Sequence, residues 1–324
     1  MKPTLSDING RVSFKTPQVF PYLKNLVGVE NSNDAWKKIY PYHLLELPLK
    51  AVINTDNGEQ STPIEAYKAI IRDDGQQIAV VRNTYTVVQP QDILAQFDPF
   101  IESGLVDLNC GGSLKNGTRI SMVGKIRGSD REIVKGEEIA SYLNFYAGLD
   151  GSLSIGADYF GLQLRCLNGL CTVNSKLNIS IRHTKSVHER LESAQSIIAK
   201  AIKSFEKTTE IYTQLALKPM TREVQETYIR NVFETKKSET PTDETEELST
   251  RQENKLDRVI ELLDTQKGLE LVPVVRGTAW QAYSAVTEYL TYEHGRNDDS
   301  RLNSQLFGES NRLNQKALNL ALTM

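Results

Sequence analysis

The segment GSLKNGTRIS, residues 112–121, separates two interpretations of the fold. Its glycines, lysine and hydroxyl residues lie close together, as they do in many phosphate-binding loops. In such a loop the lysine and the hydroxyl residue follow the second glycine directly and open a helix. Here Gly117 precedes a strand-like run instead, and Asn116-Gly117 is a strong hairpin signal because both residues tolerate positive φ. The segment therefore favours a β-hairpin whose turn carries Lys115 and Arg119.

Strand-like segments surround this turn. LVDLNCGGSL (residues 105–114) precedes it and TRISMVGKI (118–126) follows it, and both are rich in residues typical of strands. The same composition predicts further strands, or strand pairs, over residues 78–88, 139–152, 159–170 and 177–184. Short strands linked by turns indicate an antiparallel sheet.

The clearest helix is predicted over residues 186–217, where apolar residues recur three, four or seven positions apart and so share one stripe. Ser186 and Glu189 form a capping-box pattern at its start, and Pro219 follows its end. A shorter helical pattern ends at Gly104, a plausible C-cap. These patterns predict helices over residues 91–104, 186–217, 221–233, 255–264, 278–294 and 313–322.

The order of these elements predicts an α+β fold: an antiparallel β-sheet with a hairpin, followed by one long helix, plus a helical C-terminal region. In the N-terminal part, we note a short apolar run from His43 to Leu49 and a loop around residues 56–58. The chain divides into a mixed N-terminal segment (1–75), a β-rich core with the long helix (76–218), a helix with an acidic flexible spacer (219–250), and the helical C-terminal region (251–324).

The amino-acid composition indicates the cellular compartment in which the protein is expected. The 324 residues are 39% hydrophobic and 24% charged, which is ordinary for a globular protein. No apolar run reaches the length of a membrane span, and the N-terminus lacks the apolar core of a signal peptide. Three cysteines fit a reducing compartment without a disulfide framework. We therefore expect a cytoplasmic protein that has no membrane contact.

Residues suited to catalysis or metal binding are few. His183 and His188 are five positions apart, which suits neither two ligands on one helical face nor alternation along a strand. Cys166 and Cys171 lack a second Cys or His cluster, so buried small side chains are the preferred interpretation. We predict no catalytic residue, no metal site and no cofactor.

The distribution of charge carries more information. The net charge of the chain is −3, whereas a dedicated nucleic-acid-binding protein is more often basic overall. Two segments are nevertheless basic: residues 111–136 hold six basic and two acidic residues, and residues 176–207 hold seven and three. The acidic residues gather in 234–248, with six acids against two lysines. Both basic segments belong to the sheet and its long helix.

Aromatic residues accompany the basic segments. Lysine and arginine meet phosphates and aromatic rings stack on unpaired bases, which is what single-stranded nucleic acid requires. The alternative is that the rings form the core, and in a strand Tyr142 and Phe145 point to opposite faces. Both interpretations stay open for Tyr85, Tyr142, Phe145, Tyr146, Tyr159 and Phe160.

Several stretches taken in order resemble the bacterial phage/plasmid-like protein family, a domain of unknown function numbered 932. The resemblance extends from about residue 20 to the end of the chain and implies a protein carried by phages, prophages or plasmids. It implies no activity and no set of functional residues. The stretches are RNTYTVVQPQDILAQFD, GGSLKNGTRI, LNFYAGLDGSLSI, LRCLNGL, IRHT, GTAWQAYSAVTEYL and RLNSQLFG.

A second resemblance concerns architecture alone. A hairpin, further antiparallel strands and one long helix are similar to the core of phage single-strand annealing proteins of the Redβ, RecT and ERF kinds. This similarity implies a ring or filament that lays DNA in a basic groove. No sequence motif of those proteins is matched.

These observations predict a DNA-binding protein of a mobile element that binds, and in recombination or replication anneals, single strands as a homo-oligomer. Positive side chains of the hairpin and the long helix would neutralise phosphates on one shared surface. The predicted site comprises Lys115, Arg119, Lys125, Arg127, Arg165, Arg182, His183, Lys185, Lys200 and Lys203, with Tyr85 and Tyr146 to stack bases.

Two alternatives stay open at this point. One is an oligomeric protein-interaction factor that acts on a host or phage protein in defence or counter-defence, through the acidic spacer and the C-terminal helices. The other is a metal-dependent hydrolase or nuclease, which would depend on His183.

Overall fold

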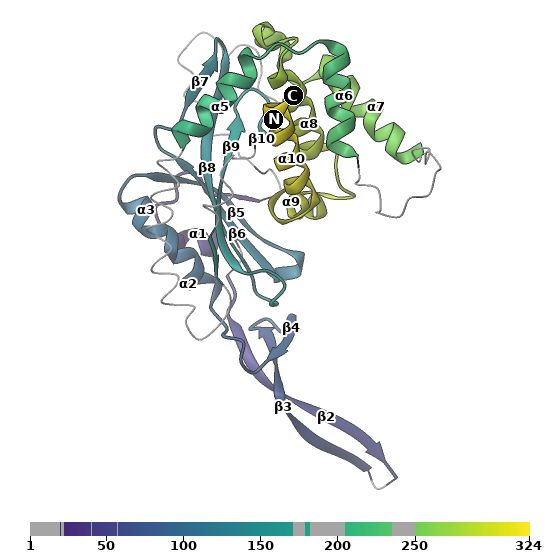
Figure 1. Cartoon of the computed structure of the whole chain (residues 1–324). Helices are drawn as coiled ribbons and strands as arrows, with labels where there is room; N and C mark the ends of the chain where they lie inside the picture. The colour runs from purple at the N-terminus through teal and green to yellow at the C-terminus, as the bar shows by residue number, and fades with distance from the viewer. Residues whose placement is uncertain are drawn as a thin grey trace.

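The computed structural model describes residues 20, 23–39, 41–56, 58–170, 179–181, 205–234 and 250–324. Within these ranges the chain forms a large antiparallel sheet, a three-stranded sheet and two groups of helices (Figure 1). The predicted α+β class is confirmed. Among the helices described, none combines the length and apolar character needed to cross a membrane.

The main sheet has eight antiparallel strands in the order β1-β5-β6-β8-β9-β10, with β7 beside β8 and β11 beside β9. The sequence-predicted strands from residue 105 onward correspond to members of this sheet. Their bounds are β1 (Lys24–Asn25), β5 (Val106–Leu114), β6 (Arg119–Ile126), β7 (Arg131–Val134), β8 (Glu137–Gly148), β9 (Ile155–Gln163), β10 (Asn168–Leu170) and β11 (Ile179–Ile181).

The turn between β5 and β6 settles the question raised by residues 112–121. Leu114 pairs with Arg119 across the hairpin, and Lys115, Asn116 and Gly117 have φ values of 48°, 55° and 89°. A run of positive φ is a turn conformation that a helix cannot contain. The hairpin is therefore confirmed, and the phosphate-loop alternative is wrong.

A long hairpin leaves the body of the protein. Strands β2 (Leu44–Thr55) and β3 (Gly58–Arg72) pair from end to end, apart from a bulge where the register shifts between Pro48 and Leu49, and we call these two strands the arm. Strand β4 (Gln77–Arg82) pairs with β3 only over Tyr67–Ile71, next to the body. Figure 1 shows the arm extending away from the main sheet. The sequence indicated the loop around residues 56–58 but not the long strands on either side.

Short helices cover one face of the main sheet: α1 (Ser32–Ile39), α2 (Pro90–Leu94) and α3 (Asp98–Glu102). The ring of Phe97 lies 4.6 Å from that of Phe145 on β8, edge to face. The helix predicted over residues 91–104 is broken into α2 and α3, with a 3-10 turn between them and Pro99 opening α3. The strand predicted over 78–88 ends at Arg82, where a turn begins.

The C-terminal helices cover the other side. Helix α8 is surrounded by its neighbours, and Trp280 and Tyr283 within it are fully buried. Helix α9 packs Leu302 against Val123 and Tyr142 on the sheet face opposite Phe97. The helix bounds are α5 (Phe205–Leu217), α6 (Arg222–Phe233), α7 (Thr250–Thr265), α8 (Ala279–Tyr292), α9 (Asp298–Phe307) and α10 (Glu309–Thr323).

Side-chain caps explain where two of these helices begin. Thr221 accepts a hydrogen bond from the backbone of Val224 at the start of α6, and Thr278 does the same from Gln281 for α8. The predicted helices from residue 221 onward are confirmed, and α9 adds one that the sequence did not indicate. Of the long helix predicted over 186–217, only residues 205–217 lie within the described ranges, where they are helical.

Candidate nucleic-acid interface

The β5–β6 turn is fastened to the root of the arm. The hydroxyl of Tyr42 donates a hydrogen bond of 3.0 Å to the carbonyl oxygen of Gly117. The guanidinium of Arg72, the last residue of β3, lies 4.4 Å from the centre of the Tyr42 ring. A Cβ atom on Gly117 would lie 2.7 Å from Nη1 of Arg72, so glycine allows this close approach. The anchored turn presents Lys115, which is exposed.

Two predicted site residues meet at one ring of α9. The guanidinium of Arg119 lies 5.6 Å from the centre of the Phe307 ring, and the Tyr146 ring lies 4.7 Å from the same ring, tilted by 60°. Arg119 also donates hydrogen bonds to Asn303 and to the Ser152 hydroxyl. Tertiary packing therefore holds Arg119 at the end of the sheet that carries Lys115. We call residues 115–119 the basic turn.

Lys125 and Arg127 lie at the opposite end of β6. The strand spans eight residues, so roughly 20 Å separate its two ends. Lys125 pairs with Asp130, with 2.6 Å between Nζ and Oδ1. Arg127 donates two hydrogen bonds, of 2.8 and 2.6 Å, to Oδ1 of Asp107. The structure thus places these two cations away from the basic turn and beside carboxylates.

Arg165 does not contribute to an outer surface. Its side chain is only 4% exposed, and its Nε lies 2.7 Å from Oε2 of the fully buried Glu137. It also donates a hydrogen bond of 2.7 Å to the carbonyl oxygen of Lys267, in the helical part of the chain. The expectation that Arg165 meets phosphates is corrected here, because a buried cation committed to a carboxylate joins the sheet to the helices instead.

The two tyrosines predicted to stack bases are half-buried. Burial raises the pKa of both hydroxyls above the usual range for tyrosine. The ring of Tyr146 lies against Gly156, where a Cβ atom would be 2.4 Å from Cζ of the ring. The ring of Tyr85 packs over Gly151 in the same way, at 3.6 Å. Neither ring therefore stands free as a platform for a base.

A cavity of about 100 Å³ lies between β8, β9, β10 and the C-terminal helices. Asp158 lines it, and Oδ1 of this carboxylate is buried without a hydrogen-bond partner among the residues described. Burial raises the pKa of Asp158 to about 6, against a smaller opposing effect of the Tyr146 hydroxyl. The rest of the lining mixes rings and amides, including Phe160, Asn144, Gln305 and Gln315.

Five predicted site residues fall outside the described residues. They are the members from the second basic segment: Arg182, His183, Lys185, Lys200 and Lys203. The acidic spacer also falls there, apart from Glu234. Convergence of the two basic segments on one surface therefore stays a prediction.

Several residues around the basic turn gave no signal in the sequence. Asn303 and Phe307 belong to α9, and their distance in sequence from Arg119 hides the contact. Asp158 gave none either, because its burial follows from the helices packed over β9.

The described residues contain no cluster of His, Cys, Asp and Glu that could hold a metal ion. Cys110 and Cys166 are buried, as the sequence favoured for Cys166.

Comparison with protein-family models matches residues 77–318 to the domain of unknown function DUF932. The chain belongs to this family. The DUF932 region begins at β4 and ends within α10, so it includes the basic turn, and the arm precedes it. The resemblance expected from about residue 20 is thus shown from residue 77. The search of curated proteins and the search of solved structures each gave no match.

Proposed function

We propose that this protein binds single-stranded DNA as a homo-oligomer, in the cytoplasm of a bacterium that carries a phage or plasmid. The observation that carries the proposal is the basic turn. Lys115 is exposed at the tip of the β5–β6 hairpin, and Arg119 is held at the same end of the sheet. The Tyr42–Gly117 hydrogen bond fixes this turn to the root of the arm. An exposed lysine on an anchored turn is suited to meet a phosphate because less backbone freedom is lost on binding.

The ion pairs elsewhere on the sheet are compatible with this function. Arg127 and Asp107 are both more than half exposed, and exposed pairs contribute only about 0–1 kcal/mol. A phosphate can therefore replace the Asp107 carboxylate as the partner of Arg127 with little loss of free energy. Lys125 and Arg127 would then extend the contact along β6, and the second basic segment would supply the remaining cations.

Binding should be measured by fluorescence anisotropy with labelled single-stranded and double-stranded oligonucleotides at several salt concentrations. We expect preferential binding of single strands and an affinity that falls with salt, because each phosphate neutralised on a single strand adds about 0.7 to the logarithmic slope. Lys115→Ala should weaken binding several-fold and reduce the slope by about one such contact.

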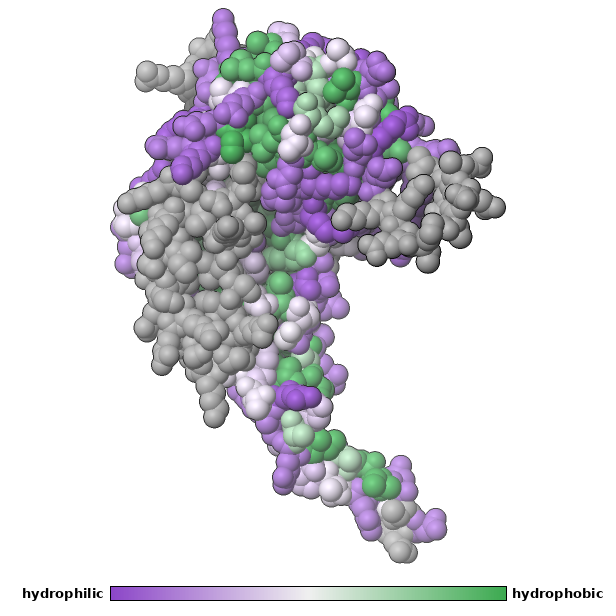
Figure 2. Space-filling model, in the orientation of Figure 1, coloured by the Kyte–Doolittle hydropathy of each residue, from purple (hydrophilic) through white to green (hydrophobic). Residues whose placement is uncertain are grey.

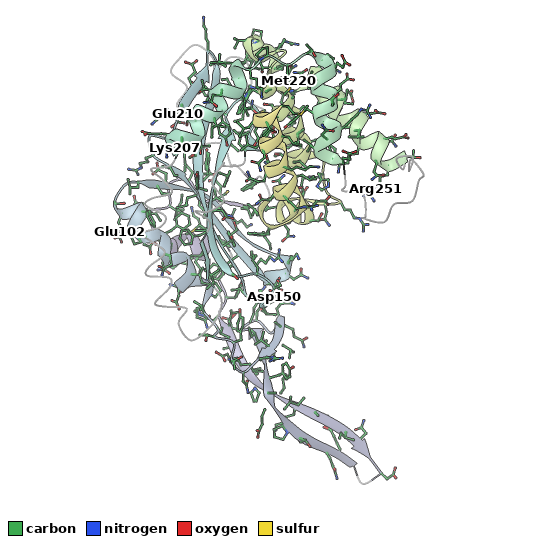
Figure 3. The ribbon with its side chains drawn as sticks, in the orientation of Figure 1. Glu102, Asp150, Lys207, Glu210, Met220 and Arg251 are labelled. Atoms are coloured by element: carbon green, nitrogen blue, oxygen red, sulfur yellow. The ribbon has the colours of Figure 1, made fainter. Side chains whose placement is uncertain are left out.

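Arg251→Ala is the matched control. Arg251 is exposed at the start of α7, and Figure 3 shows it far from Asp150, which neighbours the basic turn. This variant should bind as the wild type does. Absence of single-strand binding at 50 mM salt, or equal effects of the two substitutions, would remove the proposal.

The arm favours a second candidate function, that of an oligomeric factor contacting a host or phage protein. It carries several exposed apolar residues, of which Leu45, Val52 and Ile53 are more than two-fifths exposed. Large exposed apolar side chains gathered on one element mark interaction surfaces. A partner that is retained after nuclease treatment, and lost when Ile53 is replaced by Asp, would support this function over DNA binding.

A further inference from the structure

One face of β2 is apolar along its length, although Thr62 and Gln60 of β3 lie beside Ala51 and Ile53. Alternate residues of β2 share a face, and its odd-numbered positions are Leu45, Leu47, Leu49, Ala51 and Ile53. Across the hairpin, Ile64 pairs with Leu49 and Ala69 pairs with Leu47, which places both on this face. Leu45, Leu47 and Ile53 are 45%, 43% and 57% exposed. Figure 2 shows hydrophobic residues along the arm, far from the body.

The outer half of the arm is also incomplete as a sheet. Beyond Tyr67, β4 no longer pairs with β3, so among the residues that the structure describes the arm continues as two strands. Two strands alone are marginally stable in water, whereas three or more strands with an apolar face are stable. Each outer edge of such a hairpin presents backbone N–H and C=O groups that a further strand can pair with.

The two outer edges differ in whether they can accept a strand. Pro63 lies in the outer half of β3, where it provides no N–H group, and Glu59 and Glu65 flank it. These features protect an edge against pairing. On β2, the stretch from Leu49 to Thr55 contains no proline and is rich in residues that favour strands. The open edge is therefore that of β2.

Charge at the outer end of the arm selects the partner. Lys50 on β2 and Asp56, in the turn directly after β2, are exposed and form no ion pair within the described part of the chain. They lie three positions to either side of Ile53. If two copies of β2 pair antiparallel about a two-fold axis at Ile53, Lys50 of each copy lies directly opposite Asp56 of the other. Opposite charges at facing positions stabilise a strand pair.

We propose that the open edge of β2 binds the same edge of a second copy of this chain, antiparallel and centred on Ile53. The contact joins two arms into a four-stranded sheet in which the apolar faces of the two β2 strands lie side by side at the centre. The same residues form both halves of this contact, as closed two-fold symmetry requires. This inference rests on the homo-oligomer proposed above and names its contact.

Charge reversal in the full-length chain tests the register, with sedimentation velocity as the measurement. Lys50→Asp faces Asp56 of the second copy, and Asp56→Lys faces Lys50, so each substitution should weaken self-association at least tenfold. The double variant exchanges the charges and should restore association to near the wild-type level. A monomer at all concentrations, or a double variant as dissociated as the single ones, would overturn the proposal.

Cysteine pairing gives a second, independent measurement. Ile53→Cys places two thiols opposite each other at the two-fold axis, with Cβ atoms about 4.5–5.5 Å apart. Val52→Cys is the matched control, because Val52 is equally exposed at 57% but faces Asn54 of the second copy. We expect a disulfide-linked dimer with Ile53→Cys under mild oxidation and none with Val52→Cys. Equal yields for the two variants, or linkage through Val52 alone, would exclude this register.

These arm variants also separate the two proposals. Lys115 and the basic turn remain intact in them, so oligonucleotide binding by single copies should persist and still depend on Lys115. Loss of self-association with retained binding supports both proposals. Retained self-association in every charge variant overturns the arm contact and leaves DNA binding standing.

Discussion

Arg165 and Glu137 form an ion pair inside the protein, with 2.7 Å between Nε and Oε2. Arg165 follows the end of β9 and Glu137 opens β8, and Gln163 donates a further hydrogen bond to the same carboxylate. The bond from Arg165 to the carbonyl oxygen of Lys267 extends this network to the helices. One pair of charges thus links the sheet to the C-terminal region.

Arg165→Met should destabilise the protein by about 3–5 kcal/mol, because it leaves the Glu137 carboxylate buried without its counter-charge. Arg127→Met, which breaks the exposed pair with Asp107, should cost far less stability, because water screens an exposed pair. Urea unfolding followed by circular dichroism measures both. The double variant Arg165→Met/Glu137→Met should recover part of the stability that Arg165→Met loses. If Arg165→Met and Arg127→Met cost the same stability, Arg165 and Glu137 do not form a buried ion pair.

Asp158 should make stability depend on pH between about 4 and 6. Its pKa in the folded protein is about 6, above the ordinary aspartate value of 3.8, so the folded state holds this proton more tightly than the unfolded state. The free energy of unfolding should therefore fall as pH rises through this window, by on the order of 2–3 kcal/mol from this group. Asp158→Asn should flatten that part of the curve and be the more stable protein at pH 7. Asp257→Asn, at an exposed aspartate of α7, is the control for the substitution itself and should leave stability at pH 7 unchanged.

Gly156→Ala should destabilise the fold by about 1–3 kcal/mol. The added Cβ atom would lie 2.4 Å from Cζ of Tyr146, inside any acceptable contact, and would push this ring away from Phe307. Gly169→Ala is the comparison, because its nearest neighbour would be Thr291 Oγ1 at 3.9 Å. Thermal melting compares the two variants. If the Gly156→Ala variant has the same melting temperature as the wild type, the Tyr146 ring is not packed against Gly156.

Cys110 and Cys166 should not react with thiol reagents at pH 8 in the folded protein. Burial raises the pKa of each thiol to about 12, so the reactive thiolate is scarce as well as inaccessible. Peptide mapping by mass spectrometry after labelling should find both residues unmodified in buffer and modified in urea. Rapid labelling of Cys110 in the native protein would contradict its burial against Phe20 and Val123.

Local signals predicted much of the architecture. Asn116-Gly117 indicated the hairpin because positive φ is a property of the residues themselves. The apolar spacing of residues 278–294 predicted α8, and the threonine before it supplies the cap. Such features depend on neighbours in sequence, so they can be derived without the fold.

The arm escaped prediction although Asn57-Gly58 carries the same turn signal as Asn116-Gly117. The apolar alternation of β2 does not indicate how long the arm is or that it projects from the body. Both depend on the absence of neighbouring strands beside β2 and β3, which the sequence does not reveal. The sequence-based prediction of the binding site was incomplete for a related reason: the burial of a side chain depends on distant parts of the chain. Lys115 was expected to be exposed and is, whereas Arg165 was expected at the surface and is buried.

The amino-acid sequence by itself determined the α+β class, the hairpin turn and the helical C-terminus, since turn and helix preferences act over a few adjacent residues. Only the tertiary structure decided that Arg165 is neutralised by Glu137, that Arg119 lies on Phe307, and that β2 keeps an open edge. Each of these depends on packing between residues far apart in the chain, where burial and distance set the electrostatic outcome.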